Sequence, residues 1–428
     1  MRERFIALDA NVASRSGRYS KELITFDALM SDILIVRQPV FDRSDSAVGY
    51  ELRYRPGGEE GDPFARSYLS GSFDVLRSGL PAYVRASRRQ LVDRIFHAAD
   101  PKSVVVLIPL EIGNDVEVIA AVEGLSQGGF VTALDDFVGS TEATTKVAGL
   151  LTVVSDVRVD LRCYTPETLK AGVASVRALK KRLIADHVED AAMRKLCLEL
   201  GFDRMQGPQF SRPEPLPAAE LPASTATALR LLALARDPNT PDRDLESAVS
   251  SDPSLTFQLL RLVNSASSGG RGIQSIGHAI RLVGRSAFVK WLALAFAASR
   301  AGNSGVDNEI ARQAVQRARM CEAIGGKDAG MLFLIGLFSL LDSMFRMPLA
   351  DVLERINLAP EARDALLDRT GPFGDALNFV EAYELGLWEQ ATALGTQLGV
   401  EPDRIPSIYT DAVQWAAEQF EPNARRAA

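Results

Sequence analysis

Carboxylates that follow short apolar runs are the residues most capable of chemistry in the first half of this chain. Three such runs end in charged residues, at Asp135 and Asp136, at Arg158 and Asp160, and at Asp186 and Glu189. In parallel α/β folds, ligand chemistry lies at the carboxyl ends of the strands. The repeated charge therefore predicts a barrel with a site on its top face. For Asp135 and Asp136, the alternative is a capped turn between a strand and a helix.

The number and spacing of the cysteines and histidines argue against several kinds of site. The chain has three cysteines, Cys163, Cys197 and Cys321, and three histidines, His97, His187 and His278. The cysteines form no CxxC pair, which argues against a zinc ribbon or a disulfide framework. No histidine stands in a His-Asp dipeptide, and so few histidines exclude the chemistry of HD-type metal phosphohydrolases. Walker A and HExxH motifs are also absent from the sequence.

The composition is that of a globular protein, with 46% hydrophobic and 24% charged residues among 428. The 48 Lys and Arg against 55 Asp and Glu give a net charge of −7. Because no strongly basic face accompanies this balance, a nucleic acid is not an expected partner. The longest apolar run, Ala329–Leu341, has 13 residues and is too short for a bilayer. We therefore expect a cytoplasmic protein with no membrane partner.

Apolar runs rich in β-branched residues alternate with amphipathic stretches before residue 215. They lie at Ile33–Val36, Val104–Ile108, Val131–Leu134, Val153–Val159 and Leu183–Ala185. Fully apolar strands separated by helical segments are typical of buried parallel strands. This pattern favours an α/β fold.

The pattern changes at a proline-dense segment between Pro208 and Pro222, which cannot continue a helix or a central strand. Beyond it the apolar spacing is helical, as in one helix that begins at Asp252-Pro253 and another that runs from Ser275 to Gly284. We therefore expect three parts: residues 1–30, an unassigned extension; residues 31–215, the barrel; and residues 216–428, an all-α domain with a C-terminal helical extension.

Six blocks of the first half resemble the EAL domains that hydrolyse the bacterial second messenger cyclic di-GMP. They lie at Arg37–Asp42, Val48–Arg55, Ala133–Phe137, Val157–Asp160, Leu183–Glu189 and Gly201–Gly207. Leu221-Pro222, Asp252–Leu255, Leu260–Ser265 and Ile273–Leu282 are similar to the HDOD module, a helical relative of the HD phosphohydrolases. The resemblance is to the EAL–HDOD (YuxH-like) subfamily. It implies a (β/α)8-type barrel followed by an all-helical HDOD domain.

The resemblance identifies site positions that this chain retains. Glu51 stands where the EAL glutamate stands, and Asp135 and Asp136 match the metal-binding pair. The remaining matches are Arg55 and Gln206 with substrate-contacting residues, Gln38 with the glutamine of the opening motif, and Glu189 with a retained glutamate. A structural ion pair is the alternative for Glu51 and Arg55, since they lie on one strand face.

Other positions depart from the family pattern. Arg85 replaces the metal-binding Asn, Ile108 replaces a metal-binding Glu and Arg158 replaces the lysine; Asp186 shortens a glutamate, and Glu111 matches a glutamate that supports a loop. A guanidinium cannot coordinate a metal. If Arg85 and Arg158 both point at Asp135 and Asp136, the acidic centre is neutralised internally. No catalytic residue, metal or cofactor is then expected; any metal would have to use Glu51, Asp135 and Asp136.

The sequence thus predicts a non-catalytic regulatory protein of the cyclic di-GMP network, with signalling proteins as partners through the HDOD domain and a homodimer as one candidate assembly. It would sense the nucleotide through Gln38, Arg55 and Gln206. One alternative is a residual phosphodiesterase dependent on Mg²⁺ or Mn²⁺. Another is a scaffold that binds no nucleotide. Contacts of both arginines with the Asp pair favour the scaffold, whereas an open cleft lined by Arg55 and Gln206 favours the sensor.

Overall fold

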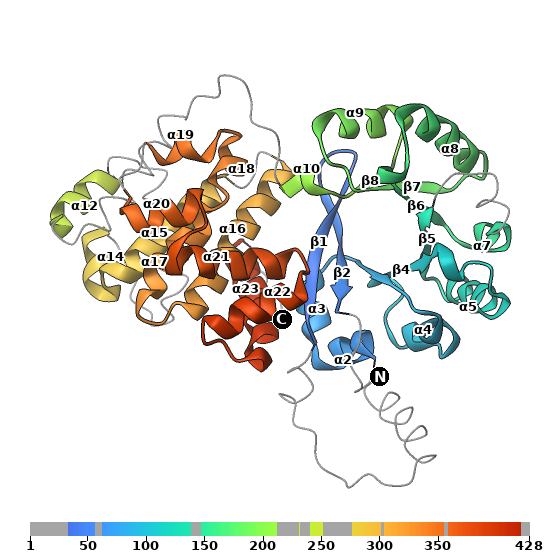
Figure 1. Ribbon diagram of the computed structural model, residues 1–428, viewed down its shortest axis with the longest axis horizontal. Coiled ribbons are helices and arrows are strands. Elements are labelled where there is room, and N and C mark those ends of the chain that lie inside the picture. Colours follow the sequence, from blue (N-terminus) through green and yellow to red (C-terminus); the bar gives the residue numbers. More distant parts are fainter. Residues whose placement is uncertain are drawn as a thin grey trace, which may run out of the picture. The chain divides into compact units, whose positions relative to one another are not determined.

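The structure is a computed structural model that describes residues 33–55, 62–137, 147–211, 231, 240–250, 276–300, 304–354 and 358–420. The chain divides into two compact units (Figure 1). The barrel unit comprises Met1–Gln209 with Pro402–Thr410, and the helical unit comprises Phe210–Glu401 with Asp411–Ala428. Within the described ranges, no helix has the length and apolar character needed to span a membrane. The predicted boundaries near residues 30 and 215 fall outside the described residues.

Eight strands close into a barrel in sequence order. They are β1 (Ile35–Asp42), β2 (Ala47–Tyr54), β3 (Ala82–Arg85), β4 (Val104–Pro109), β5 (Val131–Phe137), β6 (Asp156–Asp160), β7 (Arg182–Asp186) and β8 (Arg204–Met205). Strands β2 to β8 run parallel, and β1 is antiparallel to both of its neighbours. The expected barrel of the (β/α)8 type is confirmed.

The prediction that the first apolar run, Ile33–Val36, belongs to a parallel strand was wrong. A tight turn joins β1 to β2, in which Asp42 Oδ1 accepts hydrogen bonds from the backbone N–H groups of Ser44 and Ser46 at 2.8 and 2.9 Å. A connection this short can join only antiparallel strands, because a parallel pair needs a crossover of a dozen or more residues.

The strand predicted over Val153–Val159 begins later than expected. Val153 is the last residue of helix α7 (Ala148–Val153), and β6 begins at Asp156. The valines continue the apolar run across the connection, and periodicity alone does not separate a short buried helix from a strand.

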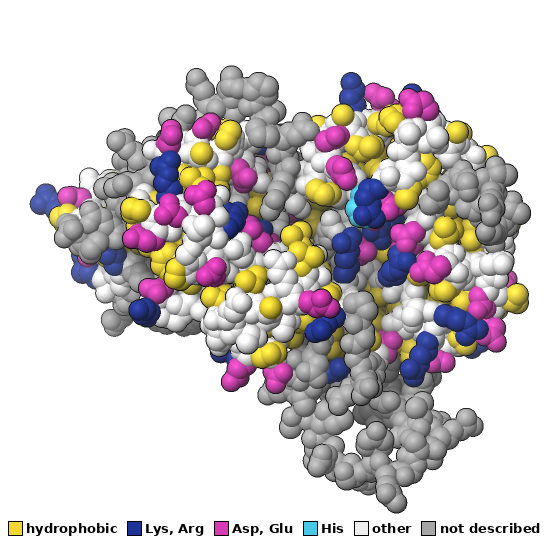
Figure 2. Space-filling model, viewed as in Figure 1, with side chains coloured by type: hydrophobic (Ala, Val, Ile, Leu, Met, Phe, Trp, Pro, Cys, Tyr) yellow, Lys and Arg dark blue, Asp and Glu magenta, His cyan; other side chains and the backbone are white. Residues whose placement is uncertain are grey.

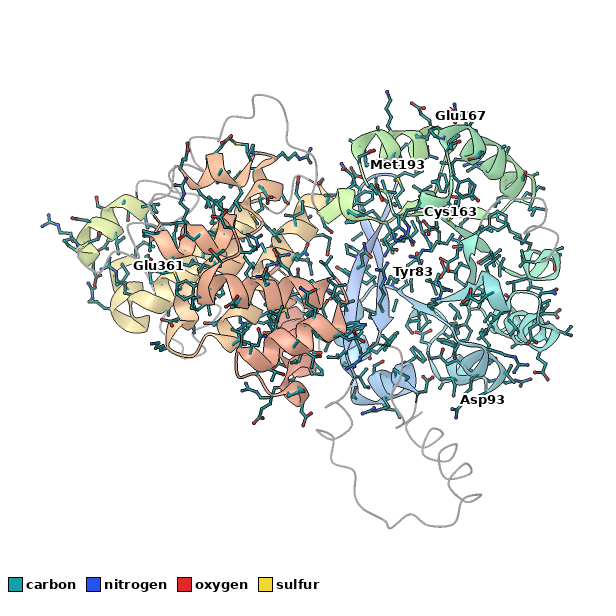
Figure 3. The ribbon with its side chains drawn as sticks, in the orientation of Figure 1. Tyr83, Asp93, Cys163, Glu167, Met193 and Glu361 are labelled. Carbon is teal, nitrogen blue, oxygen red and sulfur yellow. The ribbon has the colours of Figure 1, made fainter. Side chains whose placement is uncertain are left out.

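Helices and short 3₁₀ turns follow the strands of the barrel (Figure 1). They are α2 (Pro63–Ser70), α3 (Ser72–Arg77), α4 (Arg88–Val92), η1 (Ile95–Ala98), η2 (Leu110–Ile112), α5 (Val116–Gln127), α7, η3 (Leu161–Cys163), α8 (Pro166–Ala178), α9 (Ala191–Leu200) and α10 (Pro208–Ser211). Side chains from several strands form a buried cluster, made of Val40, Tyr83, Val105, Leu107, Ala133 and Ile184. Tyr83, a member of this cluster, is labelled in Figure 3.

The described part of the helical unit contains helices and no strand, as expected. The elements are α12 (Asp242–Ser250), α14 (Ile276–Val283), α15 (Arg285–Arg300), α16 (Gly305–Ile324), η4 (Gly326–Asp328), α17 (Ala329–Phe338), α18 (Leu341–Phe345), α19 (Leu349–Leu353), α20 (Pro360–Leu367), α21 (Gly371–Glu384) and α22 (Trp388–Gln397). Of the two elements that follow, η5 (Pro402–Arg404) belongs to the barrel unit, and the unit boundary after Thr410 divides α23 (Ile405–Phe420). Gly284, at φ +80°, ends α14 as predicted. The helix predicted after Asp252-Pro253 lies outside the described residues.

A buried ion-pair network joins α16 to α21. The side chain of Arg317, on α16, is 3% exposed. Its guanidinium donates to Glu381 at 3.0 Å, to Glu384 at 2.6 Å and to Ser339 Oγ at 2.9 Å. Arg369 pairs with the same Glu381 at 3.0 Å. Charge as well as apolar packing therefore holds α21 against α16.

Gly207 lets the end of β8 approach the segment after β7. Its φ is +152°, and a Cβ atom there would lie 2.3 Å from the backbone nitrogen of Val188. The Val188 N–H donates to the Gln206 carbonyl at 2.9 Å. A side chain at residue 207 would separate these segments and move Gln206.

We expect Gly207→Ala to lower the free energy of unfolding of the barrel unit in urea by about 3 kcal/mol or more. Gly79→Ala is the matched control, because Gly79 also has a positive φ but a Cβ atom added there would meet no other atom within 4 Å. That control should cost about 1 kcal/mol. Equal losses in the two variants would contradict the proposed close approach.

Candidate functional site

The guanidinium of Arg158 lies inside the barrel among three carboxylates. Its side chain is 4% exposed. Its two terminal nitrogens form a fork with Glu51, from Nη1 to Oε1 at 3.1 Å and from Nη2 to Oε2 at 3.0 Å. Nη2 also donates to Asp186 at 2.5 Å, and Nη1 lies 3.4 Å from Asp135. One cation on β6 therefore links the ends of β2, β5 and β7.

Two strand ends repeat one backbone arrangement around this cation. Asp136 and His187, which follow Asp135 and Asp186, have φ values of +53° and +60°. Each donates its backbone N–H to the preceding Asp Oδ1, at 3.0 and 2.8 Å respectively. The left-handed conformation turns each amide back toward its carboxylate, at an energetic cost for residues other than glycine. Both carboxylates are held in place by the backbone as well as by Arg158.

Glu51 accepts more hydrogen bonds than the other carboxylates of the cluster. Besides Arg158, it accepts hydrogen bonds from Gln206 Nε2 at 2.6 Å and from Arg53 Nη2 at 3.1 Å. Burial opposes its ionisation, but the positive charges of Arg158 and Arg53 outweigh burial and lower the pKa of Glu51 to about 2. Glu51 is therefore a carboxylate at neutral pH.

The neighbouring aspartates differ in their proton affinity. Burial raises the pKa of Asp135 to about 6, against the attraction of Arg158. Burial also acts to raise the pKa of Asp186, but the hydrogen bond with His187 and the charge of Arg158 prevail and lower it. The His187 ring places Nδ1 3.1 Å from Asp186.

Arg85 binds the outer side of the cluster. Its Nη1 donates to Asp135 at 2.8 Å and to Asp136 at 2.5 Å, and its Nη2 donates to Glu111 at 3.1 Å. The Arg85 side chain remains 44% exposed. Unlike Arg158, it therefore lies at the boundary between the cluster and solvent.

The structure brings together most of the residues predicted for the site, namely Glu51, Arg85, Asp135, Asp136, Arg158 and Gln206. Ile108 is buried on β4 and pairs in register with Leu134. Glu189 is exposed and has no contact with the cluster in the described part of the chain. Asp186, whose side chain is one methylene shorter than that of a glutamate, supplies a carboxylate to the cluster instead.

The two remaining candidates lie on the first two strands. Gln38 is half-buried in register with Glu51, and Arg55 is exposed just after β2. Within the described ranges, neither side chain makes a hydrogen bond or an ion pair. The alternative of a Glu51–Arg55 ion pair was wrong, since the partner of Glu51 on its own strand is Arg53.

The sequence analysis did not identify Arg53 as a partner of Glu51, and it did not identify Asp186 as a member of the cluster. The alternation of β2 places Arg53 on the same face as Glu51, two residues away, and this spacing was the available signal. Asp186 was identified only as a shortened glutamate, although it ends an apolar strand as Asp135 does. Glu111, expected to support a loop, pairs with Arg85.

The donor set does not fit a divalent metal. Among the described residues, no group of three or more His, Cys, Asp or Glu side chains is arranged to hold one. The oxygens of Glu51, Asp135 and Asp186 face guanidinium nitrogens, and Ile108 offers no oxygen. Guanidinium groups cannot act as ligands, so a metal would have to displace them.

Comparison with known proteins agrees with this architecture. The HDOD domain profile matches residues 221–348. The chain is 25% identical over 402 residues to the uncharacterized protein YuxH of Bacillus subtilis, covering 90% of this chain and 98% of that protein. It is 24% identical over 415 residues to the cyclic di-GMP phosphodiesterase CdgJ of Vibrio cholerae, covering 92% and 94% respectively. These matches support the resemblance to the EAL–HDOD family.

The chain is also similar to solved EAL structures over less than half of its length. The FimX EAL domain from Pseudomonas aeruginosa, bound to c-di-GMP, has 18% identity and a TM-score of 0.34 and covers 41% of this chain and 88% of that one. An EAL domain protein from Listeria monocytogenes has 17% identity and a TM-score of 0.34 and covers 46% and 94%. The HDOD match and the two relatives confirm the family resemblance seen in the sequence, while the loss of catalysis stays a prediction.

Removal of the central cation should destabilise the barrel strongly. We expect Arg158→Met to lower the free energy of unfolding by about 3–5 kcal/mol, because it leaves buried carboxylates without a counter-ion. Arg88→Met is the matched control; Arg88 pairs with Asp115 at 2.7 Å, but its side chain is 49% exposed. The control should change stability little. Urea unfolding that gives equal losses would refute the central role of Arg158.

The lowered pKa of Glu51 predicts a specific dependence of stability on pH. Since its pKa is about 2 in the folded protein, against an ordinary glutamate value of 4.5, its stabilisation is complete above pH 4.5. That stabilisation is lost as the pH falls toward 2. The difference in unfolding free energy between wild type and Glu51→Gln should shrink by about 3 kcal/mol over this range. A difference that stays constant from about pH 6 to about pH 2 would contradict the assignment.

Proposed function

We propose that this chain is a non-catalytic regulatory protein of the cyclic di-GMP network. The observation that carries the proposal is the two-pronged pairing of buried Arg158 with Glu51, the position of the EAL glutamate. The relationship to CdgJ, a protein named as a cyclic di-GMP phosphodiesterase, supports the same network. The HDOD domain supports action through signalling proteins as partners.

Hydrolysis of a phosphodiester by metal ions requires carboxylates that are free to hold them and a bound water whose pKa they lower. Here the oxygens of Glu51, Asp135 and Asp186 already interact with an arginine that cannot lose its proton. Arg158 supplies positive charge but neither polarises nor deprotonates a coordinated water. The cluster is therefore suited to hold the barrel together rather than to generate a nucleophile.

Two forms of this regulatory function differ in whether the barrel binds the nucleotide. The contacts of Arg85 and Arg158 with Asp135 favour a scaffold, and Gln206 is buried against Glu51. A sensor is the second candidate, because Arg55 is exposed at the same end of the barrel. A sensor of this kind would bind without a metal.

The experiment is incubation of the purified full chain with cyclic di-GMP in Mg²⁺ or Mn²⁺, followed by recovery of the nucleotide. We expect the nucleotide to be recovered intact, because no described carboxylate group is arranged to hold the metal. Hydrolysis that disappears in Glu51→Gln would overturn the proposal in favour of a residual phosphodiesterase. Calorimetric titration of cyclic di-GMP into the chain, with and without Mg²⁺, then distinguishes the two forms. A sensor gives a heat of binding in both buffers, and a scaffold gives none in either.

A further inference from the structure

The outer face of β1 has no helix that follows it directly in the sequence. Each parallel strand of a (β/α)8 barrel is followed by a helix that covers its outside, but β1 turns at once into β2. Val40 belongs to the cluster inside the barrel, and side chains alternate along a strand, so Ile35, Arg37 and Phe41 face outward. Ile35 and Phe41 are nevertheless only 5% and 0% exposed. Other parts of the barrel unit therefore cover this face.

A segment from near the end of the chain contacts β1. Pro402–Thr410, which contains η5 and the first turns of α23, belongs to the barrel unit. The backbone N–H of Arg37 donates to the hydroxyl oxygen of Tyr409 at 3.1 Å. Tyr409 and Ile405 are both 2% exposed. The start of α23 is therefore packed into the barrel unit, although the whole helical unit separates it from the barrel strands in the sequence.

The Arg37 side chain joins the same strand to α3. Its guanidinium donates to the Leu76 carbonyl at 3.1 Å and to Ser78 Oγ at 2.7 Å. It also lies 4.4 Å from the centre of the Tyr50 ring, on β2. Residue 37 therefore links β1 to α3 through its side chain and to α23 through its backbone.

The residue after Arg37 lies next to the carboxylate cluster. Gln38 is in register with Glu51, and the alternation along β1 places it on the inner face with Val40. The cluster reaches solvent at Arg85, and Figure 2 shows Lys and Arg side chains gathered over the middle of the barrel unit. A displacement of β1 would therefore alter a charged site that is open to solvent.

The later turns of α23, from Asp411 onward, belong to the helical unit. The Trp415 ring packs against Phe333 of α17, with ring centres 6.1 Å apart and an angle of 86° between the rings. The guanidinium of Arg319, on α16, lies 5.6 Å from the centre of the Trp415 ring. Since α23 runs without a break over Ile405–Phe420, one helix carries contacts within both units.

We infer that α23 is a coupling helix, which transmits a displacement of α16 and α17 to β1 and through Gln38 to the carboxylate cluster. Backbone hydrogen bonds fix the rise of a helix at about 1.5 Å per residue, and coupling between distant sites travels through rigid elements of this kind. A shift at Trp415 therefore also moves Tyr409. The inference goes beyond the proposed function, because it assigns the route by which a partner bound to the helical unit would act on the barrel. It applies equally to a sensor and to a scaffold.

The test is amide hydrogen exchange of the β1 peptide, measured by mass spectrometry on the full chain. We expect Trp415→Ala to raise the exchange rate of the β1 amides by about 10-fold, within the usual range of coupling between sites. Leu366→Ala is the matched control, because Leu366 is 1% exposed in the same unit but lies on α20. Its loss also leaves a cavity, yet it should leave the exchange of β1 unchanged.

Two further variants distinguish a rigid link from a general loss of stability. Insertion of two glycines between Thr410 and Asp411 interrupts the helix and keeps every side chain that makes the contacts. In that background, Trp415→Ala should no longer change the exchange of β1. Tyr409→Phe removes the hydroxyl that accepts from Arg37, and it should raise the exchange rate of the Arg37 amide by about 5-fold.

Three results would overturn the inference: unchanged exchange of β1 in Trp415→Ala, an equal rise in Leu366→Ala, or an undiminished response to Trp415→Ala after the glycine insertion. If Trp415→Ala does not fold, Trp415→Phe is measured in its place, with a smaller rise expected and the same three outcomes decisive. Hydrolysis of cyclic di-GMP in the nucleotide-recovery experiment would refute the proposed function and leave this coupling intact, so the two fail independently.

Discussion

A buried positive charge with no means of losing its proton is the constraint on which the barrel depends. Arg158 is surrounded by Glu51, Asp135 and Asp186, and burial of any one of these charges alone would be strongly unfavourable. Together they compensate one another. Because the participating residues belong to four strands, the same interaction that makes burial tolerable also holds the strand ends at a common level.

The source of the positive charge separates this cluster from a metal centre. A metal ion exchanges with solvent, and its occupancy follows its concentration. Arg158 is part of the chain, so its positive charge is present in every folded molecule. The positive charge inside the barrel is therefore independent of the metal concentration. The positive charge does not stabilise the three carboxylates equally. Burial raises the pKa of Asp135 to about 6, whereas the pKa values of Glu51 and Asp186 are lowered.

Sequence reasoning identified the cluster but not all of its partners. The resemblance pointed to Glu51, Asp135 and Arg158, which stand within recognisable blocks, and the structure brings these three side chains together. It overlooked Arg53, whose role depends on the side-chain alternation of β2. It also valued Glu189 above Asp186, because residue type was compared without knowledge of which side chain reaches the barrel interior. Distances between strand ends are set by barrel closure, which no local pattern encodes.

The sequence predicted the main parts of the fold, but not the direction of β1 or the end of α7. Strand-like runs and helical spacing identified a barrel followed by an all-α region, since both signals repeat over many residues. The antiparallel β1 was missed because its apolar run looks like that of a parallel strand. Its direction is determined by the short turn that follows. The end of α7 at Val153 was missed for a related reason, because an apolar run can cross from one element into the next.

The ion-pair network of the helical unit bears on where its HDOD domain ends. The family profile stops at residue 348, yet Arg317 lies inside that range and both of its glutamates lie beyond it, on α21. A fragment cut at the profile boundary would keep the guanidinium in the interior of α16 and remove Glu381 and Glu384. The smallest autonomous folding unit is therefore longer than the region of recognisable sequence, and α21 belongs to the core of the domain rather than to an appendage.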